Sequence, residues 1–287
     1  MNKIRIENYN LNKTLLGGQS FSWEYINDAY WGVIQNTVVK IKETKEYWYW
    51  QTYPEKDNYK LIEEYFRINT DYEKILKEID KDEYIRKAIS TYPGLRLLNM
   101  PFDQTLISFI ISQNKNIPAI RSSIKKLSVL LGQKIEIENN IFHLFPTLED
   151  ISNASLDVLK STGIGYRAEY LKNTSTQLLQ NNLSKNIQEY SKEKDIEKVR
   201  ELLTNLHGIG NKVADCIMSY SLDFLEITPL DVWAKRFCNE YYCIPTKNYL
   251  DTSKWLTEYF GKYTAYAGQY LFEYIREEKN LKLQENN

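Results

Sequence analysis

A chain of 287 residues can enclose a sizeable core, or form one domain with a smaller companion, and its 43% hydrophobic and 26% charged residues are typical of a globular protein. The apolar run at 106–111 is far shorter than the roughly 20 residues that cross a bilayer, and the N-terminus lacks the apolar segment of a secretion signal, so we expect a cytoplasmic protein without a membrane partner. The net charge of −1 counts modestly against nucleic-acid binding, and any basic face must be local.

The cysteines and histidines form no recognisable metal-binding pattern. None of Cys216, Cys238 and Cys243 belongs to a CxxC pair, and His143 and His207 lie far apart in the chain. A zinc site needs about four ligands at recognisable spacing, and an iron–sulfur cluster needs four cysteines. We therefore expect a reduced protein without a metal.

The first sixty residues have the pattern of β-strands. Residues 31–41 are rich in valine and isoleucine, residues 46–52 are aromatic, and the Gly17-Gly18 and Asn27-Asp28 pairs are turn signals. From Leu61 onward, apolar residues recur with helical spacing.

A break at Tyr92-Pro93-Gly94 separates these short helices from a longer helical region. Beyond it, helical periodicity predicts helices at 104–113, 117–131, 155–161, 166–181, 194–204, 211–222, 230–242, 250–260 and 263–278. The expected fold class is therefore α+β, with a small N-terminal antiparallel β-rich domain with short helices (1–93) and a larger all-α domain (94–287).

The segment 206–216, with the sequence LHGIGNKVADC, has two glycines between two predicted helices. Gly208 and Gly210 permit unusual backbone angles and leave N–H groups uncovered at a helix N-terminus, where the helix dipole favours an anion. Such a helix–hairpin–helix can hold a phosphate. A plain turn between two helices explains the glycines equally well when they are considered alone.

Lys212 lies in the first turn of the second helix, which is a poor position for a lysine that serves only solubility. The positive helix end disfavours an ammonium group, and a nucleophilic lysine must be uncharged. Cys216 follows four residues later on the same helix face. Asp231 follows a proline and is expected to open the next helix; a simple N-cap is the alternative role, and the two roles are compatible.

A second glycine pattern occurs at 162–167, again between predicted helices. It presents an aromatic side chain, Tyr166, followed by the guanidinium of Arg167. A tyrosine taken alone is more often a core residue than a wedge, and the chain contains 23 of them.

Taken together, 206–216 and 229–233 (PLDVW) resemble the helix–hairpin–helix DNA glycosylases. Three further motifs narrow the resemblance to the 8-oxoguanine DNA glycosylase/AP lyase branch: GGQSFSW at 17–23, SQNKNI at 112–117 and GIGYRA at 163–168. The segment AGQYLF at 267–272 is similar to the family's base-pocket helix. The motifs follow the family's order through nearly the whole chain.

This resemblance implies a TBP-like N-terminal domain and a bifunctional, monomeric enzyme of base excision repair. It would flip 8-oxoguanine out of double-stranded DNA, excise it through a lysine Schiff base, and then cleave the abasic site by β-elimination. Lys212 would attack the sugar C1′, and Asp231 would stabilise the cationic sugar. The Gly18 carbonyl would accept the N7 proton that guanine lacks, while Cys216 and Phe272 would sandwich the base.

The resemblance also implies contacts with the duplex. Asn114 would fill the gap left by the flipped nucleotide, and Tyr166 would wedge beside the orphaned base, which Arg167 would contact. The remaining members of the implied DNA-binding set are Asn116, Gly208, Gly210, Val213 and Trp233. Backbone N–H groups of the hairpin would hold a phosphate. The resemblance implies no cofactor, apart from a structural cation that the hairpin could bind.

Three positions depart from the family pattern. Ala119 stands where strict members carry an arginine that enforces cytosine opposite the lesion, so we expect relaxed selectivity for the opposite base. Gly268 replaces a glutamine that touches the Watson–Crick edge of the base, and Gln269 is the available substitute. Trp233 replaces a phosphate-contacting histidine.

Three rival functions are less consistent with these residues. A monofunctional alkyl-base glycosylase of the superfamily would keep Asp231 but lack Lys212. An endonuclease III-like enzyme would carry four cluster-binding cysteines near its C-terminus. A non-enzymatic module that binds DNA structure would have the hairpin glycines without the lysine–aspartate pair.

Overall fold

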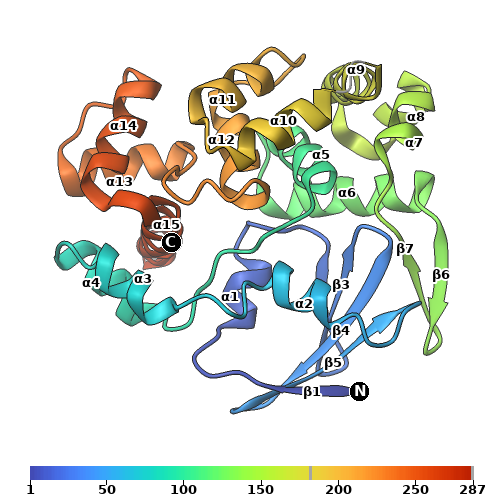
Figure 1. Ribbon diagram of the computed structural model, residues 1–287, viewed down its shortest axis with the longest axis horizontal. Coiled ribbons are helices and arrows are strands. Elements are labelled where there is room, and N and C mark those ends of the chain that lie inside the picture. Colours follow the sequence, from blue (N-terminus) through green and yellow to red (C-terminus); the bar gives the residue numbers. More distant parts are fainter. Residues whose placement is uncertain (181–182, 286–287) are drawn as a thin grey trace.

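We describe the chain from a computed structural model that covers residues 1–180 and 183–285. A twisted sheet occupies one end of the molecule and a larger group of helices the other, and the C-terminal helix lies between that group and the short helices that follow the sheet (Figure 1). The last residue of the helix expected at 166–181 lies outside the described residues. Within them, no helix is both long and apolar enough to cross a membrane.

The N-terminal sheet is antiparallel throughout, as predicted, with strand order β1-β5-β4-β3-β2. Its strands are β1 (Asn2–Arg5), β2 (Trp23–Ile26), β3 (Ala29–Ile34), β4 (Thr37–Glu43) and β5 (Tyr47–Tyr53). Asn27 and Asp28 both have positive φ, which suits the tight hairpin between β2 and β3. The run at 31–41 is two strands rather than one, because the chain turns at Gln35, whose φ is also positive.

Aromatic packing joins the sheet to the short helices. The indole of Trp23 lies against Gly32 on the neighbouring strand, where a Cβ would come within 2.2 Å of the ring. Trp23 is fully buried, and its Nε1 donates to the Tyr65 hydroxyl at 2.9 Å. Large buried rings supply most of the transfer free energy of such a small core.

The N-terminal part also contains helices α1 (Leu11–Leu16), α2 (Tyr59–Tyr65), α3 (Tyr72–Ile79) and α4 (Glu83–Thr91). The first of these was not predicted. Asn10 caps it by accepting from the Lys13 N–H at 2.9 Å, and it ends at Gly17, so that it delivers the glycine pair of the 17–23 motif.

The C-terminal part is helical, as predicted, apart from one small hairpin. Its elements are α5 (Phe102–Ser112), α6 (Ile117–Leu131), β6 (Lys134–Ile137), β7 (Asn140–His143), α7 (Leu148–Asn153), α8 (Leu156–Leu159), the wide turn η1 (Lys160–Ile164), α9 (Arg167–Gln180), α10 (Leu183–Lys192), α11 (Ile196–Thr204), α12 (Asn211–Ser221), α13 (Val232–Tyr242), α14 (Tyr249–Phe260), the short turn η2 (Gly261–Tyr263) and α15 (Thr264–Glu285). The β6–β7 hairpin, α7 and α10 were not predicted.

Three helices place the functional segments. Helix α5 is buried from Gln104 to Ser112, and α12 packs beside it. Helix α15 packs against α13 and also against α3 and α4, so the last helix holds the short N-terminal helices onto the helical part (Figure 1). The boundary predicted at residue 93 stays a prediction.

Candidate active site

One large cavity, of about 1220 Å³, opens where the N-termini of α12 and α13 face the 17–23 loop, the α5–α6 connection and α15. It brings together all the predicted site residues except Tyr166, Arg167 and Gly208. Segments separated by more than two hundred residues thus contribute to a single space large enough for a nucleoside.

Lys212 is the second residue of α12, and its side chain reaches the cavity beside α5. Its Nζ donates to the Ser112 hydroxyl at 3.3 Å and lies 5.2 Å from the centre of the Phe109 ring. The amine therefore lies over an aromatic wall, between the Ser112 hydroxyl and the Cys216 thiol, and it faces the cavity.

Asp231 is the N-cap of α13, as the sequence predicts, and it also faces the cavity. Its Oδ1 accepts from the Ala234 N–H at 2.8 Å. Burial raises the pKa of this carboxyl, while the capping N–H groups of α13 and the charge of Lys212 oppose that rise. The cap fixes the carboxylate in position at the same time as it favours the ionised form.

Cys216 and Phe272 line the cavity from α12 and α15. Burial raises the pKa of the Cys216 thiol to about 12, so this side chain is a neutral, polarisable contact rather than a nucleophile. Gly18 has a φ of +113°, and a Cβ there would meet the Ile117 side chain at 2.9 Å. Only glycine fits this turn comfortably, and it brings backbone to the cavity wall.

Gly268 lies in a tight contact that leaves no room for a larger side chain. A Cβ on Gly268 would lie 1.9 Å from the Thr228 hydroxyl, so α15 and the loop before α13 are in direct contact there. The adjacent Gln269 is nearly buried and lines the cavity, and its Oε1 accepts from Tyr220 at 2.9 Å. Its Nε2 has no hydrogen-bond partner among the described residues, which leaves a buried donor for a ligand.

The α5–α6 connection supplies two asparagines with different environments. Asn114 is exposed at the cavity and has a φ of +49°, a left-handed conformation that asparagine tolerates. Asn116 also lines the cavity, but its Oδ1 caps α6 by accepting from Ala119 at 2.9 Å. At the opposite rim, the Trp233 ring is covered by Arg236, whose guanidinium carbon is 4.7 Å from the ring centre.

The predicted hairpin between α11 and α12 is present. Gly208 has a φ of +82°, and a Cβ there would meet the Tyr170 ring at 2.2 Å. Gly210, the N-cap of α12, has open space around its Cα, so another molecule can approach the N–H groups beyond it, including that of Val213. The described residues contain no group of three or more His, Cys, Asp or Glu that could hold a metal ion, and a cation at the hairpin stays a prediction.

Tyr166 and Arg167 lie at the η1–α9 junction. Tyr166 is 51% exposed and packs edge-on against Tyr170, which in turn covers the hairpin glycine. Arg167 differs from the expectation, because its side chain is buried and its guanidinium donates to the carbonyls of Gln113, Asn114 and Ile164. In this conformation it supports the loop that carries Asn114 and does not offer its donors to a base.

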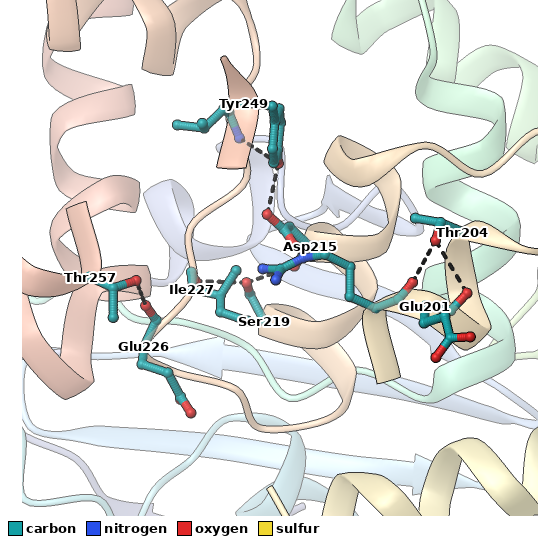
Figure 2. A network of polar contacts seen from close by, with 10 residues as sticks. Glu201, Thr204, Asp215, Ser219, Glu226, Ile227, Tyr249 and Thr257 are labelled. Carbon is teal, nitrogen blue, oxygen red and sulfur yellow. Dashed lines mark hydrogen bonds and ion pairs between the residues drawn. The ribbon is translucent and has the colours of Figure 1, made fainter. Parts of the chain in front are cut away.

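A polar network that the sequence did not reveal fixes the loop between α12 and α13. The buried Asp215 carboxylate accepts from Arg200 at 3.0 Å and from the Tyr249 hydroxyl at 2.8 Å (Figure 2). The same hydroxyl accepts from the N–H of Leu230, the residue before Asp231, at 3.2 Å. Asp215 lies one turn after Lys212 on α12, and through Tyr249 it is linked to Leu230. The network therefore fixes the position of Asp231 relative to Lys212.

Two hydroxyl groups secure the loop further along. Ser219 donates to the Ile227 carbonyl at 2.8 Å, and Thr257 of α14 donates to the Glu226 carbonyl at 2.7 Å (Figure 2). Burial raises the pKa of Asp215 to about 6, with Arg200 and Tyr249 opposing the rise, so the carboxylate depends on both partners. No sequence motif includes these residues, because they interact with partners that are distant in the sequence.

We predict that Tyr249→Phe destabilises the protein and slows catalysis. The change leaves the Asp215 carboxylate and the Leu230 N–H without their shared partner, which costs about 1–3 kcal/mol. Urea unfolding measures the stability, and single-turnover excision measures the loss of Asp231 positioning. Tyr25→Phe, at a tyrosine that is 55% exposed, is the matched control and is expected to change neither. If Tyr249→Phe had wild-type stability and a wild-type excision rate, the network would not determine the position of Asp231.

Two family models together match most of the chain. Residues 2–106 match the family model described as 8-oxoguanine DNA glycosylase, N-terminal domain, and residues 107–262 match the HhH-GPD superfamily base excision DNA repair protein model. The chain therefore belongs to the HhH-GPD superfamily of base excision DNA repair proteins, and within it to the 8-oxoguanine DNA glycosylase family.

Curated relatives agree with this assignment. A probable N-glycosylase/DNA lyase of Methanothermobacter thermautotrophicus is 31% identical over 246 residues, which cover 78% of this chain and 76% of that protein. The N-glycosylase/DNA lyase of Saccharomyces cerevisiae is 35% identical over 167 residues, but the match spans only 55% of this chain and 44% of the yeast protein.

Solved structures share the whole fold. The Clostridium acetobutylicum 8-oxoguanine glycosylase/lyase, in complex with duplex DNA that has cytosine opposite 8-oxoguanine, superimposes with a TM-score of 0.87 at 30% identity, covering 96% of this chain and 94% of that one. A structure described as MBOgg1 in complex with a low-affinity DNA ligand has a TM-score of 0.89 at 30% identity, with 96% of both chains covered.

Proposed function

We propose that this protein excises 8-oxoguanine from double-stranded DNA and then cleaves the resulting abasic site, with Lys212 as the nucleophile. The observation that carries the proposal is the convergence of the Lys212 amine and the Asp231 carboxylate on one nucleoside-sized cavity, in a chain of the 8-oxoguanine glycosylase family. Because all of these residues come from one chain, a monomer suffices.

The reaction follows from these two groups. The uncharged amine adds to C1′ as the bond between C1′ and the base nitrogen breaks, and the base leaves with the bonding electrons and gains a proton. The Asp231 carboxylate stabilises the positive charge that develops on the sugar. Loss of the ring oxygen's bond to C1′ gives a Schiff base on Lys212, and removal of a C2′ proton then expels the 3′ phosphate by β-elimination.

Recognition of the base divides between backbone and side chains. The Gly18 carbonyl accepts the N7 proton of 8-oxoguanine, and guanine, which has a bare acceptor at N7, would leave that carbonyl without a partner. Cys216 and Phe272 contact the two faces of the base. The Nε2 of Gln269 donates to the Watson–Crick edge, and Tyr220 holds the amide in place.

Duplex contacts surround the cavity. Extrusion of a nucleotide costs a few kcal/mol of stacking, which Asn114 and Tyr166 offset by filling the vacated space and wedging beside the orphaned base. Asn116 and Trp233 lie at the rim, and the N–H groups near Gly208, Gly210 and Val213 hold a phosphate, with a cation at the hairpin as the proposed structural cofactor. The protein then works where DNA is, in a bacterial nucleoid or a eukaryotic nucleus.

The direct test compares excision from duplexes that differ only in one base. We expect single-turnover release of 8-oxoguanine and strand cleavage at the same position, and little release from the same duplex with guanine there. Equal rates on both duplexes, or release of an alkylated base in preference to 8-oxoguanine, would contradict the proposed substrate.

We also predict weak selectivity for the base opposite the lesion. Ala119 has no donor for a partner base, and the guanidinium of Arg167 is occupied by backbone carbonyls. Discrimination of one base from another by a bidentate arginine amounts to about 1–3 kcal/mol, so without it the excision rates opposite C, A, G and T should lie within roughly tenfold. Excision opposite cytosine alone would show that another residue reads the partner base.

A further inference from the structure

Outside the residues assigned above, one buried ion pair lies directly behind the cavity. Glu273 and Arg276 occupy successive turns of α15, and Arg276 Nη2 donates to Glu273 Oε2 at 2.6 Å. The Glu273 side chain is fully buried, whereas the Arg276 side chain is 21% exposed and reaches the cavity wall. A buried pair of this kind seldom adds much net stability, so the contacts that it makes with its surroundings are the better guide to its role.

The Glu273–Arg276 pair contacts the backbone of the 17–23 loop. Arg276 Nη1 donates to the Gly17 carbonyl at 3.0 Å. The Glu273 carboxylate packs on the same glycine so closely that a Cβ on Gly17 would lie 2.5 Å from Oε1. The Gly17 carbonyl and the Gly18 nitrogen belong to one rigid peptide plane. This contact therefore fixes the orientation of the peptide group that precedes the Gly18 Cα.

The loop is held on its other side as well. Gln19 is fully buried, its Nε2 donates to the Arg96 carbonyl at 2.7 Å, and its Oε1 accepts from the Leu98 N–H at 3.0 Å. Gly18 thus lies between two anchored neighbours. A glycine is conformationally free, so the direction of its carbonyl depends on such anchors.

Arg276 makes a second contact that bears on the same base. Its guanidinium carbon lies 5.0 Å from the centre of the Phe272 ring, one helical turn earlier. Burial raises the pKa of the Glu273 carboxyl to about 7, opposed by Arg276 and then Lys13. The guanidinium therefore links the loop, the aromatic ring and the buried carboxylate.

We propose that Glu273 and Arg276 are positioning residues that aim the Gly18 carbonyl at the N7 proton of the damaged base, and so set the preference for 8-oxoguanine without contacting the base. This inference rests on the proposed function, in which Gly18 reads N7. An arginine that only stabilised the fold or attracted phosphate would affect all bases equally. An arginine that aims the carbonyl affects only bases with a proton at N7.

The test measures binding to duplexes that contain either 8-oxoguanine or its 7-deaza analogue, in which a C–H replaces the N7 proton donor. Lys212→Gln serves as the parent, because it blocks the chemistry and leaves the Gly18 loop intact. We expect the parent to bind the 7-deaza duplex about tenfold more weakly, since a buried carbonyl loses its donor. In Arg276→Met on this parent, the ratio of the two dissociation constants should fall to about twofold, and Arg276→Lys should restore part of it.

Two further variants control for misfolding of the Arg276 variants. Glu273→Gln combined with Arg276→Met removes both charges and avoids a buried carboxylate without its cation, and it should lose the ratio as Arg276→Met does. Lys279→Met makes the same kind of change one turn later on α15, where Lys279 pairs with Glu240, and should keep the parent ratio. An unchanged ratio in the folded Arg276 variants overturns the inference. A parent without any preference would instead refute the reading of N7 by Gly18.

Discussion

Replacing Lys212 with glutamine is expected to lower single-turnover excision of 8-oxoguanine by about 10³-fold or more, because the amine that forms the covalent bond is removed. Strand cleavage through the Schiff base should be lost with it. Duplex binding should remain, since the amine contacts only Ser112 and the wall of the cavity in the free protein.

Lys60→Gln is the matched control for this change. Lys60 is the second residue of α2, as Lys212 is of α12, and its side chain is exposed and pairs with Glu64. Its replacement should leave excision unchanged. If Lys212→Gln retained excision within a few-fold of wild type, the nucleophile would have to be another group.

Asp231→Asn is expected to slow excision by about 10²-fold while preserving the fold, because asparagine caps helices as well as aspartate does but carries no charge to stabilise the sugar cation. Thermal unfolding should show nearly wild-type stability. Asp71 is the N-cap of α3 and does not line the cavity. Asp71→Asn should therefore change neither the excision rate nor the thermal stability. A large loss of stability in Asp231→Asn alongside unchanged excision would mean that Asp231 only caps α13.

The same carboxylate predicts a pH dependence. Burial raises the pKa of Asp231 above that of an ordinary aspartate, about 3.9, so the reactive ionised form is lost as the pH falls through the raised value. The single-turnover rate should therefore decline on the acid side at a higher pH than an exposed aspartate would produce. This limb should disappear in Asp231→Asn, and its persistence there would assign it to another group.

Much of the candidate site could be predicted because its residues occur in short motifs with local consequences. A lysine at the start of a helix, an aspartate that caps the next helix and a glycine pair before a strand each have a meaning within a few residues of sequence. The fold class followed in the same way, since the change from strand to helical periodicity near Leu61 is strong.

The parts that were missed depend on contacts across the chain or on weak local signals. Arg276 acts on Gly17, 259 residues away, and Tyr249 acts on Asp215, 34 residues away, and neither pairing leaves a local pattern. In the β6–β7 hairpin, KIEI alternates polar and apolar residues but NIFH does not, and both strands are short and stand among helices. The sequence suggested a base contact for Arg167, but nearby backbone carbonyls determine where its donors point.

The central claim is that the Lys212 amine joins the sugar of an extruded nucleotide. Borohydride reduction of the reaction with an 8-oxoguanine duplex, followed by proteolysis and mass spectrometry, identifies the residue that carries the deoxyribose. The account predicts the sugar on Lys212 and on no other amine. A reduced adduct on a different lysine or on the N-terminal amine, or no adduct during active excision, would contradict it.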